Sequence, residues 1–238
     1  MVTRFALGDI EVDVVLKEIK NIHLSVYPPT GRVRISAPSG MKIDTLRLYA
    51  ISRLGWIKKQ RRKLQGQERE TPREYLNRES HYLWGKRYLL KIVERDAPPF
   101  VDLQHSAIIL HIRPGASEER KQVVLDEWYR QQLKVAIANL IALWEKRVGV
   151  GVQEFGIKKM KTRWGTCNPE ARRIWVNLEL AKKPRVCLEY IVVHEMVHLL
   201  EHHHNDRFVL LMDNVMPNWR SVRDDLNRLP VKHEEWIY

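Results

Sequence analysis

The chain has 238 residues, 44% of them hydrophobic and 29% charged, so it can bury an ordinary core as one large or two small domains. No apolar stretch approaches the ~20 residues that cross a bilayer, which predicts a soluble protein without a membrane partner. The net charge of +12 favours an anionic partner such as nucleic acid, a nucleotide or an acidic protein surface.

The acidic start of the chain and the lack of a membrane-spanning stretch predict a cytoplasmic protein. Asp9, Glu11 and Asp13 place acidic residues early in the chain, where a signal peptide would be basic and then apolar. Cys167 and Cys187 are the only cysteines and fit no metal-binding pair pattern, so we expect free thiols rather than a disulfide framework.

The first part of the chain predicts a small antiparallel sheet. Three segments alternate apolar and polar residues, around 10–14, 22–26 and 33–35. Pro28-Pro29-Thr30-Gly31 is a turn signal between the second and third of these strands.

A helix with a basic end is predicted next. Asp44 can cap it, and its apolar residues keep a helical period as far as Ile57. The run from Lys58 to Lys63 then holds five cations in six residues. Cations at a helix end also complement the helix dipole, so a merely solvated basic face is the alternative to a nucleic-acid or nucleotide surface.

The polar stretch 66–78 is the predicted linker between two domains, a β-rich region over 1–66 and a larger domain over 79–238. Residues 88–93 and 108–112 are short, β-branched segments typical of strands. Ser117 can cap a long helix whose apolar stripe ends at Val148, before Gly149.

His194-Glu195-Met196-Val197-His198 lies within an apolar run from Tyr190 to Leu200, which predicts a largely buried helix. Histidines four residues apart share one helix face about 6 Å apart along the axis, so both can reach one metal ion. In this H-E-x-x-H arrangement the glutamate polarises a zinc-bound water and moves its proton. Two structural histidines are the alternative, but unpaired polar groups in a core helix would be costly.

A catalytic zinc ion needs three protein ligands and a water, and the segment 201–204 offers four candidates for the third ligand. On one straight helix His202 would lie about 12 Å from His194, so the helix is predicted to end near His202. Glu201 follows His198 by nearly one turn and is predicted to orient a ligand rather than to bind the metal.

Asn205 and Asp206 are good turn and cap residues before a further apolar segment, Phe208–Met212. A turn at this point would swing one imidazole back toward the first two. His204 is favoured as the third ligand, with His203 as the alternative.

These residues carry a family resemblance. The string from His194 to Phe208 resembles the YgjP-like, SprT-related metal-dependent hydrolases, whose pattern is HE-x-x-H, a His six residues later and a Phe four beyond. The block from Lys159 to Cys167 is similar to the family's K-M-K-S-R-W-G-S-C stretch, with Thr at both Ser positions. Residues 174–178 look like the strand before the zinc helix, and the segments 31–38 and 56–57 extend the likeness toward the N-terminus.

The resemblance implies an α+β fold in which a small β-rich domain precedes a zincin-like catalytic domain with an active-site helix. It implies that His194, His198 and His204 bind the metal and that Glu195 is the general base. Zn²⁺ is the expected cofactor, although histidine sites also take nickel, cobalt or manganese. The family often has Asn-His where this chain has His203-His204, which places a competing imidazole beside the expected ligand.

The leading hypothesis is a zinc metallopeptidase acting on a protein or peptide substrate. Arg163 or Lys161 would steady the developing oxyanion, with surface charge as the alternative role. Trp164 and Gly165 would pair with an extended substrate, with a packed Trp and a turn Gly as the alternative. Cys167 is predicted to be a packing residue rather than a nucleophile.

Two other hypotheses fit the positive charge. A metal-dependent nucleoside triphosphate pyrophosphohydrolase is one, because this activity is attached to some YgjP-like proteins. A non-catalytic nucleic-acid-binding protein with a structural metal is the other. Structural zinc sites usually have four protein ligands and are rich in cysteine, which argues against the second of these.

Overall fold

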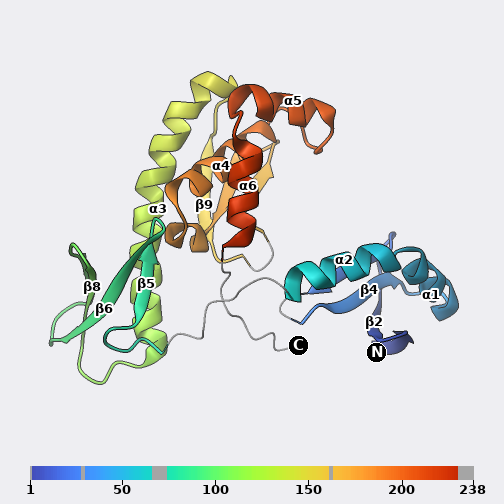
Figure 1. Ribbon diagram of the computed structural model, residues 1–238, viewed down its shortest axis with the longest axis horizontal. Helices are drawn as coiled ribbons and strands as arrows, with labels where there is room; N and C mark the ends of the chain where they lie inside the picture. The colour runs from blue at the N-terminus through green and yellow to red at the C-terminus, as the bar shows by residue number, and fades with distance from the viewer. Residues whose placement is uncertain (1, 28–29, 66–73, 161–162, 230–238) are drawn as a thin grey trace. The chain divides into compact units, whose positions relative to one another are not determined.

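The computed structural model describes residues 2–27, 30–65, 74–160 and 163–229 (Figure 1). Their contacts divide the chain into two compact units, one within Met1–Pro72 and the other within Arg73–Leu229. Most of the predicted linker 66–78, and the last nine residues of the predicted second domain, lie outside the described residues. Within these ranges, no helix is both long enough and apolar enough to cross a membrane.

The first unit contains a four-stranded sheet in the order β1-β2-β4-β3. The strands are β1 (Val2–Leu7), β2 (Ile10–Lys17), β3 (His23–Tyr27) and β4 (Arg32–Pro38). The prediction of an antiparallel sheet is wrong for one pair, because β2 and β4 run parallel. It also missed β1. A half-buried strand alternates in the same way beside a parallel or an antiparallel neighbour, so the pattern could not give the direction.

Two helices, α1 (Ile43–Ser52) and α2 (Leu54–Gln65), lie along one side of this sheet (Figure 1). The predicted single helix is wrong, because the chain leaves helical geometry at Arg53. The predicted cap is wrong too: Lys42 occupies the cap position, and Asp44 lies in the first turn. An acidic residue in the first turn still complements the helix dipole. Asp44 therefore marks the start of the helix, although it does not occupy the cap position. Leu46, Ala50 and Ile57 are buried against the sheet as the helical period predicted.

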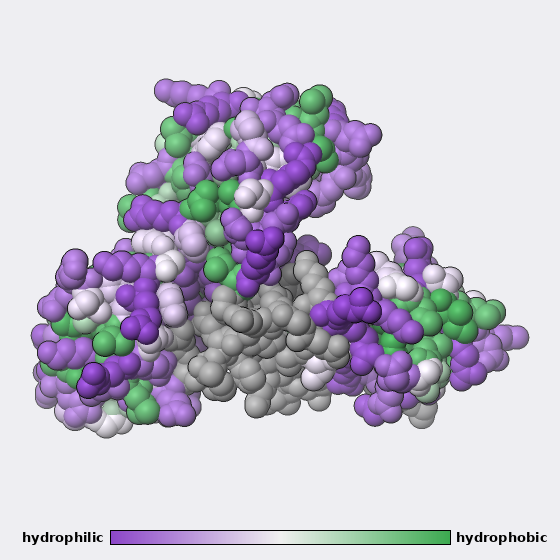
Figure 2. Space-filling view, in the orientation of Figure 1, coloured by the Kyte–Doolittle hydropathy of each residue, from purple (hydrophilic) through white to green (hydrophobic). Residues whose placement is uncertain are grey.

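The basic run forms the end of α2. Lys58, Lys59 and Arg62 are exposed, whereas Arg61 lies 3.6 Å from a carboxylate oxygen of Asp9. Figure 2 shows hydrophilic side chains over α2 and hydrophobic ones over α1. Lys58, Lys59 and Arg62 are therefore accessible on this unit, and an anionic partner for them stays a prediction.

Asp13 on β2 is buried at 3% exposure and holds two arginines. Its carboxylate accepts hydrogen bonds from Arg4 Nε, at 2.7 Å, and from Arg32 Nε. Burial alone would raise the pKa of Asp13, but the bonds from Arg32 and Arg4 outweigh it and hold the pKa below 3.8. The ion pair therefore ties β1, β2 and β4 together.

Replacing Asp13 with asparagine should lower the free energy of unfolding of the first unit by about 1–2 kcal/mol at pH 7, because it removes a buried charge that two partners satisfy. A depressed folded-state pKa contributes stability that is complete above the unfolded value and is lost as pH falls through the folded one. The difference between the two proteins should therefore shrink below about pH 4. Hydrogen exchange of peptides from residues 2–65 measures it, with the exposed Asp9→Asn as control. An equal loss at pH 7 and pH 3 would contradict the charge argument.

The second unit begins with a sheet in the order β5-β6-β8-β7. Its strands are β5 (Ser80–Leu83), β6 (Lys86–Glu94), β7 (Phe100–Leu103) and β8 (Ala107–Ile112). The two predicted strands are confirmed as parts of β6 and β8. The other two have only four residues each, too few to show a period.

The long helix α3 (Glu118–Val148) follows. Ser117 accepts a hydrogen bond from the Arg120 N–H, and Gly149 ends the helix in the left-handed conformation at φ 77°. Both predicted ends are confirmed. Its buried stripe packs against the remainder of this unit and includes Leu133, Ile137 and Trp144.

A second sheet, in the order β10-β11-β9, supports the candidate site. Its strands are β9 (Glu154–Lys158), β10 (Gly165–Asn168) and β11 (Arg173–Asn177), and a 3₁₀ turn, η1 (Leu178–Lys182), follows. The predicted strand is confirmed as β11, whereas β9 and β10 were not predicted. β10 pairs antiparallel with β11 and lies at the edge of the sheet.

Three helices complete the unit: α4 (Arg185–Val197), α5 (Asp206–Val215) and α6 (Trp219–Arg228). α4 contacts α3 and α6 as well as the strands β10 and β11. It is therefore held between the sheet and the other helices. The predicted α+β class is confirmed, with a mixed sheet in the first unit and a helix-rich second unit.

Candidate metal centre

The helix α4 positions the H-E-x-x-H residues. Val192, Val193, Met196 and Val197 are fully buried and fix the rotation of the helix. The helix ends at Val197, earlier than the predicted end near His202, and His198 is its C-cap. The N–H of Glu201 still bonds to the Val197 carbonyl at 3.0 Å, so one loose turn follows the helix. The earlier ending gives the chain room to turn back before α5.

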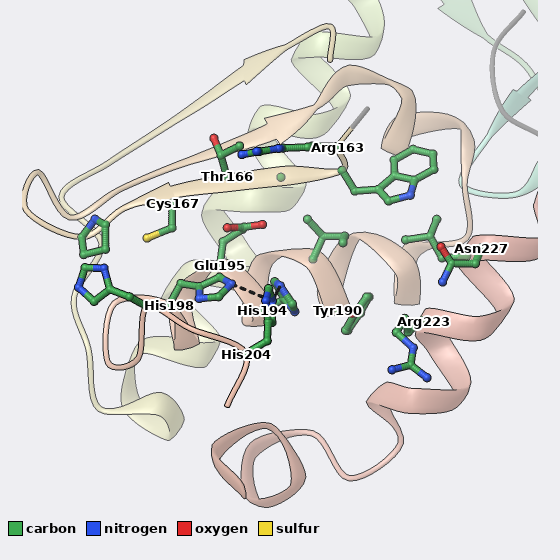
Figure 3. A pocket seen from close by; sticks show the side chains of 16 residues that line it. Arg163, Thr166, Cys167, Tyr190, His194, Glu195, His198, His204, Arg223 and Asn227 are labelled. Carbon is green, nitrogen blue, oxygen red and sulfur yellow. Dashed lines mark hydrogen bonds between the residues drawn. The ribbon is translucent and has the colours of Figure 1, made fainter. Parts of the chain in front are cut away.

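The structure brings the three predicted histidines together (Figure 3). The Nε2 atom of His204 lies 3.0 Å from Nε2 of His194 and 3.2 Å from Nε2 of His198. Nitrogens about 2.1 Å from a tetrahedral zinc ion would be about 3.4 Å apart, close to these distances. The three nitrogen donors therefore fit a divalent metal ion.

The loop after α4 orients this cluster. The ring Nδ1 of His198 lies 2.9 Å from the Glu201 carbonyl oxygen, and donation of its proton would leave Nε2 with a lone pair toward the other rings. Glu201 thus orients a ligand candidate, as predicted, but through its backbone. Its carboxylate accepts the His203 N–H at 3.2 Å.

The exposed His203 is not part of the cluster, so the structure favours His204 over this alternative. Asn205 caps α5 by accepting the Phe208 N–H at 3.0 Å, as predicted. The Phe208 ring then packs against the rings of all three clustered histidines, with centroid distances of 4.6–5.0 Å. The cap therefore fixes the start of α5 next to His204 and holds the Phe208 ring against the three histidines.

Two of the clustered imidazoles are held neutral. Burial, followed by the charges of His198 and His204, lowers the pKa of His194 to about 3. Burial also lowers the pKa of His198, with the Glu201 carbonyl acting in the opposite direction. Neutral imidazole is the form that binds a metal ion, so these side chains are ready to bind at neutral pH.

Glu195 is buried beside the histidines at 5% exposure. Burial raises the pKa of this carboxyl to about 8, against an opposing effect of Arg163. It lies tightly against β10, because a Cβ atom added to Gly165 would be 2.5 Å from its Oε1 atom. Gly165 is therefore the residue that makes room for the Glu195 carboxylate.

An open cleft of about 610 Å³ leads to these residues. The predicted substrate-binding residues Arg163, Trp164 and Gly165 all line it, whereas Lys161 lies outside the described residues. Figure 3 shows Arg163 on the side of the sheet and Arg223 on the side of α6.

A family model described as YgjP-like, metallopeptidase domain, matches residues 20–229. The chain belongs to the YgjP-like family. A crystal structure of the metallopeptidase zymogen of Pyrococcus abyssi abylysin is similar to it, with 17% sequence identity and a TM-score of 0.36, covering 38% of this chain and 90% of that one. No curated protein matches the chain.

The family model is a metallopeptidase domain, so membership of the YgjP-like family identifies this chain as a metal-dependent hydrolase. The matched region reaches from the first sheet to the end of α6 and therefore includes every residue of the histidine cluster. The predicted resemblance is confirmed over most of the chain.

Cys167 lines the same cleft but is not set up as a nucleophile. Burial, followed by the nearby Glu195, raises the pKa of the Cys167 thiol to about 12. Because the thiolate is the reactive form, this thiol is inert at neutral pH. Cys167 and Cys187 are both free, as predicted.

Several cleft residues were not predicted from the sequence. Tyr190, Arg223 and Asn227 line the cleft, the last two from α6. Asn177, at the end of β11, donates to the carbonyls of Met160 and Arg163, at 2.8 Å each. It thereby holds the chain that leads into β10. The position of Asn177 between a strand and a turn is typical of a capping residue. Its bonds to Met160 and Arg163 could not be predicted, because these partners are distant in the sequence.

Proposed function

We propose that this protein is a zinc-dependent peptidase in which His194, His198 and His204 hold the metal and Glu195 is the general base. The observation that carries the proposal is the convergence of three imidazole nitrogens, 3.0–3.2 Å apart in two of the pairs, beside a buried carboxylate. Three nitrogen ligands without cysteine suit an open catalytic zinc site better than a structural one. Nickel, cobalt and manganese are the alternative metals.

A bound zinc ion would polarise both a water molecule and the scissile carbonyl. Glu195 takes the proton from the attacking water and passes it to the leaving amine. Burial raises the pKa of this carboxyl, and the charge of a bound zinc ion would lower it again toward the carboxylate form that accepts a proton. Arg163, whose charge acts on Glu195, would steady the developing negative charge on the substrate oxygen.

The edge strand β10 supports a peptide as substrate. Among the described strands, it pairs only with β11, so an extended substrate could pair with its second edge. Trp164 and Gly165, where β10 begins, line the cleft beside Glu195. An added peptide strand would gain backbone hydrogen bonds there and present its carbonyl to the site.

The proposal is tested by chelation and reconstitution. The zinc-loaded protein should cleave members of a mixed peptide library, lose this activity after dialysis against a chelator, and recover it when zinc is restored. Mass spectrometry of the library measures cleavage. Peptide cleavage that persists in metal-free protein would contradict the proposal.

The second candidate is metal-dependent pyrophosphohydrolysis of nucleoside triphosphates. Two arginines, Arg163 and Arg223, line the cleft, and a phosphate chain could bind between such cations. The same preparations are therefore assayed for pyrophosphate release. Zinc-dependent release without any peptide cleavage would replace the peptidase with this activity.

Replacing Gly165 with alanine should reduce turnover by about 100-fold while zinc binding is kept, because the new methyl group would push the Glu195 carboxylate out of position. Steady-state kinetics and metal content measure the two effects. Gly151→Ala is the matched control, since its nearest neighbour to an added Cβ is 3.9 Å away. Full activity of the Gly165 variant would show that the close contact is not needed.

A further inference from the structure

The cleft extends beyond the histidine cluster toward α6. Tyr190 and Ile191 line it one helical turn before His194 and Glu195 on α4. One turn of helix is about 5.4 Å, roughly the length of one to two extended residues. Leu226 and Trp164 add apolar walls, and Arg223 and Asn227 from α6 bring polar groups to this part. The arrangement is a mostly apolar subsite with a cation.

Stacked aromatic rings hold that cation. The guanidinium carbon of Arg223 lies 5.1 Å from the centroid of the Trp219 ring. Trp219 stacks in turn on Tyr190, at 6.4 Å and an angle of 11°, and its ring nitrogen donates to Asp213 at 2.7 Å. A guanidinium already held beside an aromatic ring loses less conformational freedom when it binds a ligand, which favours binding at Arg223.

Part of the Arg223 guanidinium remains available. One oxygen of Asp224 accepts from Nε at 3.0 Å and lies 2.9 Å from Nη2. In the described part of the chain, Nη1 has no hydrogen-bond partner. The side chains of Arg223 and Asp224 are 42% and 51% exposed, and such surface pairs are weak and exchange readily.

The charges around the cleft favour an anionic ligand. Arg163 and Arg223 both line it, whereas Glu195 is the only acidic residue among the described lining residues. A guanidinium binds a carboxylate through two parallel hydrogen bonds. A neutral amide of the same shape would offer only one acceptor there, and a cationic side chain would be repelled.

We infer that Arg223 selects peptides that carry a carboxylate within about two residues of the scissile bond. This inference rests on the proposed peptidase function and names its substrate class. The carboxylate can belong to an acidic side chain or to the C-terminus of the peptide, since both offer the same planar pair of oxygens. Tyr190, Ile191 and Leu226 then contact the aliphatic part of that residue.

The test measures binding separately from turnover. Short peptide hydroxamates attach to zinc through the hydroxamate and carry Glu, Gln or Lys as the next side chain. Their affinities for the zinc-loaded protein are measured by calorimetry. The Glu compound should bind about 10-fold more tightly than the Gln compound, and the Lys compound most weakly.

The variant Arg223→Glu should reverse this order, with the Lys compound bound best. Arg228→Glu is the matched control, because Arg228 lies on the same helix, is 80% exposed and does not line the cleft. It should keep the order of the parent protein. Asp224→Asn, an exposed change that frees the guanidinium, should increase the Glu-to-Gln ratio and covers the case in which Arg223→Glu fails to fold.

The outcomes separate the two proposals. Equal binding of the Glu and Gln compounds, or a preference that survives Arg223→Glu, would overturn the inference even if peptides are cleaved. A preference that depends on Arg223, without cleavage of any peptide, would keep the carboxylate site and remove the peptidase function. A failure of all three hydroxamates to bind would overturn both.

A second set of compounds distinguishes the sources of the carboxylate. It compares a Glu side chain on an amidated peptide with an Ala side chain on a peptide with a free C-terminus. Tighter binding of the first indicates an acidic side chain, and tighter binding of the second indicates a terminal carboxylate. Either result supports the inference. If both compounds bind equally weakly, the inference is contradicted.

Discussion

Glu195→Gln should lower kcat by about 10²- to 10⁴-fold, the usual contribution of a general base, while zinc content stays unchanged. Glutamine keeps the shape of the side chain but cannot accept the proton of the attacking water. The carboxylate is buried at 5% exposure and faces Gly165, so an isosteric amide fits the same space. Steady-state kinetics on a cleaved library peptide and elemental analysis of the purified variant measure the two quantities.

Two controls make this result specific. The Glu201 side chain is 14% exposed and accepts the His203 N–H, but the residue orients His198 through its backbone carbonyl, so Glu201→Gln should keep most of the activity. A melting curve shows whether either variant is destabilised. If Glu195→Gln turns over substrate at the parental rate with a full complement of zinc, another group must be the base.

His204→Ala should weaken zinc binding by more than about 100-fold and abolish turnover, because loss of a ligand costs more than loss of a residue that only supports one. His203→Ala is the closest control, one residue away in the same loop and outside the cluster. Its zinc affinity should match that of the parent. Competition with a chromophoric chelator measures both affinities.

The opposite pattern would identify His203 as the ligand, with the loop rearranged when the metal binds. An equal loss in both variants would instead indicate that the whole loop, rather than one imidazole, is needed. In either case the pairing of His194 and His198 on α4 would stand, since their spacing on the helix is independent of the loop.

Much of the second unit could be predicted because its signals are local. Ser117 and Gly149 mark both ends of α3, and Asn205 marks the start of α5. Each of these residues acts on backbone groups within four positions of itself. The predicted end of α4 lies too late in the chain. The helix ends where the following loop turns back, and no capping residue marks that position.

The first unit illustrates a different limit. Alternation identified the faces of its strands but could not tell that β2 and β4 run parallel, because that depends on where β3 is placed. The break at Arg53 was hidden by a period that continues across it. In both cases the information lies in contacts between segments rather than within one.

By itself, the sequence determined the chemistry of the candidate site: two histidines and a glutamate on one helix face, a third histidine beyond a turn, and a match to a hydrolase family. Only the tertiary structure decided that His204 joins them, that Gly165 contacts Glu195 and that Arg223 enters the same cleft. The physical reason is distance along the chain. The helix itself converts a spacing of a few residues into geometry, whereas residues that lie in different elements meet only through the packing of the whole unit.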